Sequence, residues 1–192
     1  ARAFLKRSDD VDVFINRRPD GPTWGMGAGI IHADPRQIHR VCDSDEYMPV
    51  LDKQHLKTDV IKVLPHAACK LPDGWVVETL QLQQNLYKSP AWPVGPRETC
   101  TVRLTARRPA DGAVRQVQRS VNVPGVNTPS GYVRATLGCG GYEACPTGNR
   151  VSTAFTYVNI LDPNGHIPQF VVNTLVPDRA LQVARVRKCV MR

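Results

Sequence analysis

The fold class is decided by residues 100–123, which read CTVRLTARRPADGAVRQVQRSVNV. Apolar and polar residues alternate over 100–106, and this period of two predicts a strand with one face exposed to water. The sequence ADG at 110–112 is typical of a hairpin turn, and the valines that follow it predict a returning strand. The stretch therefore predicts an antiparallel hairpin in a β-rich domain.

Similar strand signals occur along the rest of the chain, at residues 12–16, 24–32, 60–64, 75–86, 132–137 and 151–161. Together with the hairpin they predict about eight strands, mostly joined by short connections. Asp34-Pro35 is a typical helix start, because Asp caps the first turn and proline suits its first position. We expect a short helix from about Pro35 to Val41, with Ile38 and Val41 on its inner side.

Residues 167–191 differ from the rest, because their apolar side chains recur with helical spacing. A helix of this length spans roughly 37 Å, at about 1.5 Å per residue, and is long enough to cross a small domain. Pro177 is expected to kink it, since proline removes the backbone bond to the carbonyl of Asn173. The sequence predicts an α+β fold in which a curved antiparallel sheet wraps around a long C-terminal helix. Such an arrangement leaves an apolar cavity between sheet and helix.

The composition indicates one globular domain over residues 1–192, since 42% of the residues are hydrophobic and 22% are charged. No apolar run approaches the roughly 20 residues of a membrane span. The net charge of +8 favours an anionic partner, either nucleic acid or a lipid surface. The arginines are scattered and do not alternate with aromatic residues, so a nucleic-acid stacking platform is not indicated.

The six cysteines contain no C-x-x-C pair, and zinc ribbons and thioredoxin-like sites therefore lack their usual spacing. Cys139 and Cys145 leave a loop-closing disulfide open as an alternative. No N-glycosylation sequon occurs, and a reducing cytoplasm is favoured.

Motifs that carry catalysis were sought and are absent. The glycines at 25, 27 and 29 suggest a dinucleotide loop, but Ile30 stands at its last glycine position and no helix follows directly. The sequence has no phosphate-binding P-loop, no nucleophile elbow and no zinc-binding helix motif. We therefore expect no catalytic residue, no metal and no cofactor.

Three stretches resemble a known family. Residues 89–98 read SPAWPVGPRE and resemble the "P-x-P-v-x-x-R-D" passage of the START domain, a lipid-transfer domain. Residues 131–135, GYVRA, resemble its "G-Y-V-R" strand. Residues 162–168, DPNGHIP, followed by Asn173, resemble the "G-x-I-P-x-x-x-x-N" start of its C-terminal helix. The resemblance covers essentially the whole chain in order.

The chain also departs from this family's pattern. Leu51 stands where the family has a tryptophan before Asp52, and Glu98 stands where it has an aspartate after the arginine. Only residues 1–7 are available for the family's N-terminal helix, which suggests a trimmed or divergent start.

The resemblance implies a helix-grip fold, in which the sheet and the C-terminal helix enclose a lipid tunnel. Similar family members pair the arginine at the position of Arg97 with a carboxylate inside the tunnel, and Glu78 or Glu98 is the expected partner here. The alternative is that Arg97 caps a strand end at the surface. Candidate lipid contacts, which would be ordinary core residues otherwise, are Val133, Leu137, Phe155, Tyr157, Phe170, Val171, Asn173 and Leu175.

The resemblance implies a protein without catalytic activity that binds one lipid and transfers it between membranes. A glycerophospholipid is slightly favoured over a sterol, because the basic charge and Arg97 suit a phosphate. The expected partners are this lipid and, transiently, an anionic membrane surface, while nucleic acid is not expected. The protein is expected to be a monomer in the cytoplasm, peripheral at membranes.

Three alternatives stay open. The domain could be the lipid-sensing module of a larger protein. An enzyme of the helix-grip group, such as a polyketide cyclase, would need an acid–base-rich cavity, and the sequence shows no cluster of His or carboxylates for it. A nucleic-acid binder is the third alternative.

Overall fold

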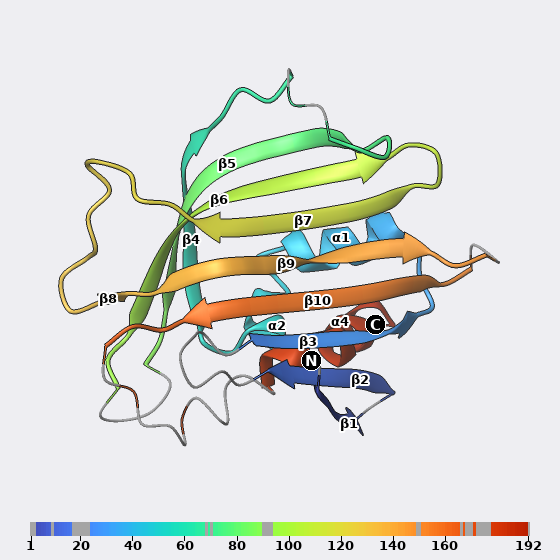
Figure 1. The fold of residues 1–192 in the computed structure, drawn as a ribbon, viewed down its shortest axis with the longest axis horizontal. Coiled ribbons are helices and arrows are strands. Elements are labelled where there is room, and N and C mark those ends of the chain that lie inside the picture. Colours follow the sequence, from blue (N-terminus) through green and yellow to red (C-terminus); the bar gives the residue numbers. More distant parts are fainter. Residues whose placement is uncertain are drawn as a thin grey trace.

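The structure, a computed structural model, describes residues 3–8, 10–16, 24–67, 69, 71–89, 94–148, 151–165, 167, 171 and 178–191. Within these residues one sheet of ten strands dominates the molecule, in the order β1-β2-β3-β10-β9-β7-β6-β5-β4 with β8 beside β6 (Figure 1). Every strand pair is antiparallel except β6 with β8. The expected antiparallel architecture is therefore confirmed, with more strands than predicted.

The strands are β1 (Ala3–Ser8), β2 (Val11–Asn16), β3 (Trp24–Ile31), β4 (His55–Val63), β5 (Val76–Tyr87), β6 (Arg97–Arg108), β7 (Ala113–Ser120), β8 (Val133–Arg134), β9 (Thr136–Pro146) and β10 (Thr153–Asp162). The predicted hairpin is β6 and β7, and Gly112 in its turn adopts a φ of 79°. Near the start of the chain, β1 pairs with β2, so residues 3–8 form a strand and not a remnant of the family's N-terminal helix.

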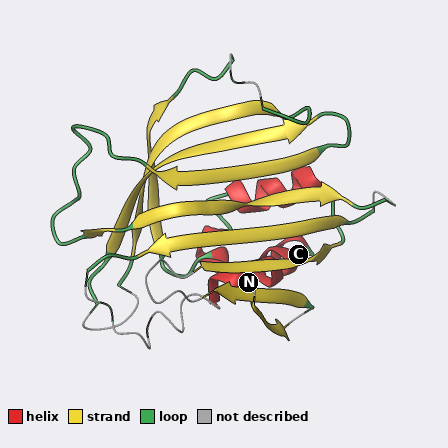
Figure 2. Cartoon of the chain, in the orientation of Figure 1, coloured by secondary structure: helices red, strands yellow, loops and turns green. Residues whose placement is uncertain are grey.

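Three helices have defined bounds, namely α1 (Pro35–Asp43), α2 (Met48–Leu51) and α4 (Gln182–Val190), and they lie on one side of the sheet (Figure 2). The predicted helix start is confirmed, because the Asp34 carboxylate accepts a hydrogen bond of 2.7 Å from the Arg36 amide. Ile38 and Val41 are buried, as expected.

Of the predicted C-terminal helix, the structure describes helical residues at 171 and 178–180 and helix α4. Pro177, where the kink was expected, lies outside the described residues. Helix α4 packs against α1, β3 and β10.

Cys139 and Cys145, the candidate disulfide pair, both lie in strand β9. Six residues of strand extend roughly 20 Å, several times the reach of a disulfide. The loop-closing disulfide is therefore wrong, and both cysteines are free.

The apolar core lies between α1, α4 and the inner faces of β2, β3 and β10. It includes Val13, Ile31, Ile38, Phe155 and Val183, each no more than 1% exposed. The glycines of β3 allow α4 to lie directly on the sheet. A Cβ added to Gly27 would collide with the carbonyl oxygen of Ala180, so only glycine fits this contact.

Candidate functional site

A cavity of about 170 Å³ lies on the same inner face of the sheet, bounded by helices α1 and α2, by Arg179 and by Gln182 of α4. Its lining comes from seven strands. The strand residues that line it are Gly25, His55, Thr58, Gln83, Asn85, Tyr87, Arg97, Thr99, Arg103, Gln116, Gln118, Leu137, Gly141, Tyr142, Tyr157, Asn159 and Leu161. Most of these residues carry a polar group, which the sequence did not predict, although apolar atoms form the larger part of the cavity surface.

The centre of this lining is a hydrogen-bonded row that crosses β4, β5 and β6. The Asn85 amide nitrogen donates to the hydroxyls of Thr99 at 3.3 Å and Thr101 at 3.2 Å. The Asn85 oxygen accepts from the Thr58 hydroxyl at 2.9 Å, and His55 Nε2 lies 2.8 Å from that hydroxyl. Burial lowers the pKa of His55, although Asp52 opposes the shift. Because each polar group has a partner, the row is stable at this depth.

Arg103 reaches the cavity wall near α1. Its Nη1 lies 2.7 Å from the Asp43 carboxylate, and its Nη2 donates to Gln81 at 2.9 Å. Its Nε is buried without a hydrogen-bond partner among the described residues. The charge of this arginine is thus compensated inside the protein.

Tyr142 separates the cavity from the core. Its hydroxyl lies 2.5 Å from His39 Nδ1, and its ring packs on Phe155 with centroids 5.4 Å apart. Burial raises the pKa of Tyr142 and lowers that of His39. The pair is therefore neutral at physiological pH.

A buried ion pair joins the segment after α2 to the residues before α4. Asp52 and Arg179 form this pair, and the Arg179 guanidinium lies 5.6 Å from the centre of the Tyr87 ring. Burial raises the pKa of Tyr87 to about 12. Burial also raises the pKa of Tyr157, which lines the same part of the cavity. These tyrosines therefore keep their protons.

Arg97 lines the cavity and is 9% exposed, so it does not cap a strand end at the surface. Its guanidinium donates to three backbone carbonyls, those of Gly95 at 2.6 Å, Pro163 at 2.8 Å and Asn164 at 3.0 Å. Burial lowers its pKa. Among the described residues no carboxylate pairs with it, which corrects the expectation from the resemblance.

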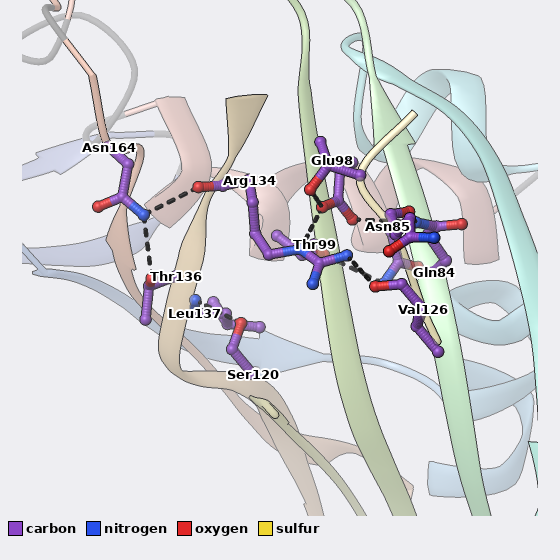
Figure 3. A network of polar contacts seen from close by, with 12 residues as sticks. Gln84, Asn85, Glu98, Thr99, Ser120, Val126, Arg134, Thr136, Leu137 and Asn164 are labelled. Atoms are coloured by element: carbon purple, nitrogen blue, oxygen red, sulfur yellow. Dashed lines mark hydrogen bonds and ion pairs between the residues drawn. The ribbon is translucent and has the colours of Figure 1, made fainter. Parts of the chain in front are cut away.

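The two expected carboxylate partners of Arg97 have other roles. Glu78 lies outside the cavity lining and forms an ion pair of 2.6 Å with Arg107. Glu98 is fully buried and pairs with Arg134 (Figure 3). It also accepts hydrogen bonds from Thr128 at 2.9 Å and Gln84 at 3.3 Å.

The Glu98 cluster fastens the segment between β7 and β8 to the outer side of the sheet. Arg134 donates to the carbonyl of Val126 at 2.9 Å, and Gln84 donates to that of Asn127 at 3.0 Å. On the other side, Asn164 donates to the Arg134 carbonyl at 2.8 Å (Figure 3). The segment between β7 and β8 is thus held by one buried carboxylate and the side chains bonded to it.

The other predicted contact residues are divided between several places. Leu137 and Tyr157 line the cavity, whereas Phe155 belongs to the core. Val133 is 36% exposed on β8, and Val171 is buried but does not line the cavity. Three further candidates, Phe170, Asn173 and Leu175, lie outside the described residues.

Sequence reasoning missed the polar lining, whose members are Asp52, Gln83, Asn85, Thr99, Arg103, Gln116, Gln118, Asn159 and Arg179. A signal was present, because polar residues recur at every second position of β5, β6 and β7. The alternation predicted a face exposed to water on β6. In the structure Thr99, Thr101 and Thr105 of that face are buried.

Two other kinds of feature, a metal-binding cluster and a membrane-spanning helix, are absent from the part of the chain that the structure describes. It holds no cluster of three or more His, Cys, Asp or Glu side chains that could bind a metal ion. Nor does any described helix have the length and apolar character needed to cross a membrane.

The sequence model of the START domain matches residues 32–191. The chain belongs to the START domain family. No curated protein matches its sequence.

Several solved structures of lipid transfer proteins are similar in fold to this START domain. Human StAR-related lipid transfer protein 5 superposes with a TM-score of 0.81 at 19% identity, over 99% of this chain and 86% of that protein. Human STARD10 gives 0.77 at 19% identity, over 99% and 73%. The STAR-related lipid transfer protein of Xanthomonas axonopodis (fragment 25–204) gives 0.70 at 17% identity, over 100% and 99%. At such identities the likeness establishes the START-like fold.

Proposed function

We propose that this START domain binds one lipid in the cavity on the inner face of the sheet and carries it between membranes. The observation that carries the proposal is this cavity in a member of the START family. Lipid transfer is also the activity that the names of the similar human and Xanthomonas proteins state. Leu137, Leu161 and Met48 supply apolar contacts, and each CH₂ removed from water contributes about 0.8 kcal/mol.

The buried arginines support a ligand with a negative charge. Arg103 and Arg179 are compensated by Asp43 and Asp52, but Arg97 contacts only carbonyl oxygens among the described residues. A buried guanidinium is costly unless an anion offsets its charge. We therefore propose that Arg97 meets the phosphate of a glycerophospholipid, a class that we favour over sterols.

Binding without catalysis suits the titratable groups around the cavity. Asp52 is engaged by Arg179, so this carboxylate is not available as a general base. Tyr87, with a pKa of about 12, is a weak general acid at neutral pH. The polar lining consists mostly of neutral amides and hydroxyls, which hold and orient a ligand.

The test begins with the lipid that the recombinant protein carries. Native mass spectrometry should detect one lipid per chain, and extraction should identify a glycerophospholipid. Transfer of that lipid between donor and acceptor vesicles should then depend on protein concentration. Protein that carries no lipid and accelerates no transfer of phospholipid or sterol would refute the proposal.

Arg97→Leu tests the head-group assignment. It should weaken phospholipid loading by about 2 kcal/mol or more, which is the scale for leaving a buried charge unpaired. The matched control is Arg119→Leu, because Arg119 is an exposed arginine of β7 outside the cavity. Equal losses in both variants would contradict a role for Arg97 in holding the head group.

A further inference from the structure

Strand β4 is an open edge of the sheet. It pairs with β5 on one side, and no other described strand pairs with its second side. An edge of this kind presents unpaired backbone N–H and C=O groups that can pair with another strand. An extended segment can cover such an edge if its side chains are complementary to those of the edge strand.

Large apolar side chains concentrate at this edge. Leu56, Val60, Ile61 and Val63 of β4 are each between 42% and 61% exposed, and Val76 at the start of neighbouring β5 is 52% exposed. In the described residues, most other exposed large apolar side chains are scattered singly. An apolar edge strand is a typical site for association.

The strand also carries charges on one face. The partners of Asp59 and Lys62 on β5 are Gln84 and Leu82, so Asp59 and Lys62 project from the same face of β4. Lys57 projects from that face too, and within one copy it forms an exposed ion pair of 2.7 Å with Asp59, which the dimer would share with Lys62. Thr58 and Val63 oppose Asn85 and Gln81, and therefore project from the other face.

The charges and faces of these residues are complementary when β4 of one copy is paired antiparallel with β4 of a second copy. In the register centred between Val60 and Ile61, Asp59 of each copy stands opposite Lys62 of the other. Thr58 stands opposite Val63, and Val60 opposite Ile61. Each pair that stands on a defined face joins side chains of the same face, as cross-strand contact requires. The centre of this register coincides with the irregularity of β4 between Val60 and Lys62, where Ile61 is skipped in the pairing with β5. A register centred on Asp59 would instead bring two carboxylates together.

We propose that the β4 edge pairs with the β4 edge of a second copy, in a two-fold symmetric dimer held by reciprocal Asp59–Lys62 ion pairs around a Val60–Ile61 centre. The family resemblance implies a monomer, and this edge points to self-association instead. Because one nine-residue strand buries less area than a standard stable interface, the dimer is concentration-dependent. His55 and Thr58 of β4 line the cavity, so the dimer contact adjoins the cavity wall.

The test uses charge reversal in two separate variants, Asp59→Lys and Lys62→Asp. Each variant places like charges opposite each other twice, and should weaken self-association about ten-fold. The equimolar mixture should recover the dimer, because both lysines of the first variant then face aspartates of the second. Sedimentation velocity across a concentration series measures all three samples. Circular dichroism checks that each variant is folded.

Matched controls carry the same charge changes elsewhere on the surface. Glu46→Lys and Arg119→Asp alter exposed residues outside β4, and neither these variants nor their mixture should change association. A wild-type protein that stays monomeric at millimolar concentration would overturn the proposal. So would unchanged association of folded Asp59→Lys, or a mixture no stronger than its components.

A membrane is the other surface that could cover an apolar strand edge. A wild-type monomer that loses binding to anionic phospholipid vesicles on Val60→Asp would assign the edge to membrane contact and overturn self-association. These outcomes are independent of lipid loading, so the dimer and the proposed lipid function can fail separately.

Discussion

The inner face of one sheet is filled in two different ways along its width. Beneath β2, β3 and β10, apolar side chains pack against α1 and α4, and Val13 and Ile31 are fully buried. Along β5, β6 and β7 the same face carries Gln83, Asn85 and Gln116, which line a cavity. Where α4 contacts the glycine-rich strand β3, the two elements form a packed core. Where polar side chains of β5, β6 and β7 bond to one another, a cavity remains between the sheet and the helices. A curved sheet can therefore be solid at one side and hollow at the other.

The cause of the difference is visible in strand β3. Its glycines at 27 and 29 remove the side chains that would hold α4 away, and the helical segment reaches the backbone of the sheet. In β5 to β7 the corresponding inward positions hold amides and hydroxyls. Their hydrogen bonds satisfy them in place, as the Asn85 contacts to Thr99 and Thr101 show.

The largest loss of stability should come from Gly27→Ala, which changes the contact between β3 and the helical segment on the packed side of the sheet. The added Cβ would collide with the Ala180 carbonyl oxygen, so the backbone of the helical segment must move. We expect a loss of at least about 4 kcal/mol in the free energy of unfolding, the range of severe core changes. Chemical denaturation measures it. Gly138→Ala is the control, because its Cβ meets only ordinary contacts at 3.5 Å. Equal stability of the two variants would refute the close contact.

Two truncations to alanine compare the packed side with the cavity side. Ile38→Ala removes a fully buried side chain of the core and should cost about 3 kcal/mol of unfolding free energy. Gln118→Ala, which shortens a side chain of the cavity lining, should change stability by less than about 0.5 kcal/mol. The same variant should alter lipid loading. Thermal denaturation and native mass spectrometry together decide, and a destabilising Gln118→Ala would indicate that the cavity is packed.

The smallest effect concerns pH and the boundary between core and cavity. Burial lowers the pKa of His39 below its ordinary 6.5, so the unfolded chain binds a proton that the folded chain does not. Stability is therefore complete above pH 6.5 and falls as the pH drops below it. His39→Gln should flatten this acid slope between pH 7 and pH 5. His32→Gln is the exposed control, and an unchanged slope in His39→Gln would contradict the assignment.

Local signals in the sequence predicted the elements well. The alternation and the turn residues located β6, β7 and the hairpin, and the Asp34-Pro35 pair located the start of α1. These signals succeed because capping and turn geometry involve neighbours in the chain. Motif order also identified the START family, which the match over residues 32–191 confirms.

The content of the site was harder to predict for a physical reason. A period of two defines two faces of a strand but does not say which one becomes concave, and the polar face of β6 was assigned to solvent. The contacts of Arg97 could not be predicted either, because two of its partners are backbone carbonyls more than sixty residues away. Because every residue has a backbone carbonyl group, the residue types in the sequence do not indicate which carbonyls will accept these hydrogen bonds.

The pairing of β3 with β10 has a consequence for how the chain is made. Ile31 lies opposite Thr153, so during synthesis β3 cannot complete its pairing until β10, near the end of the chain, has been made. At a synthesis rate of about 5–20 residues per second, this wait lasts roughly 6–25 s on the ribosome. Strands β4 to β7 pair with one another in chain order, so this meander can assemble in that time. Until β10 emerges, β3 can pair only with β2 and keeps its other edge open, and this interval is when the nascent protein most needs shielding from aggregation.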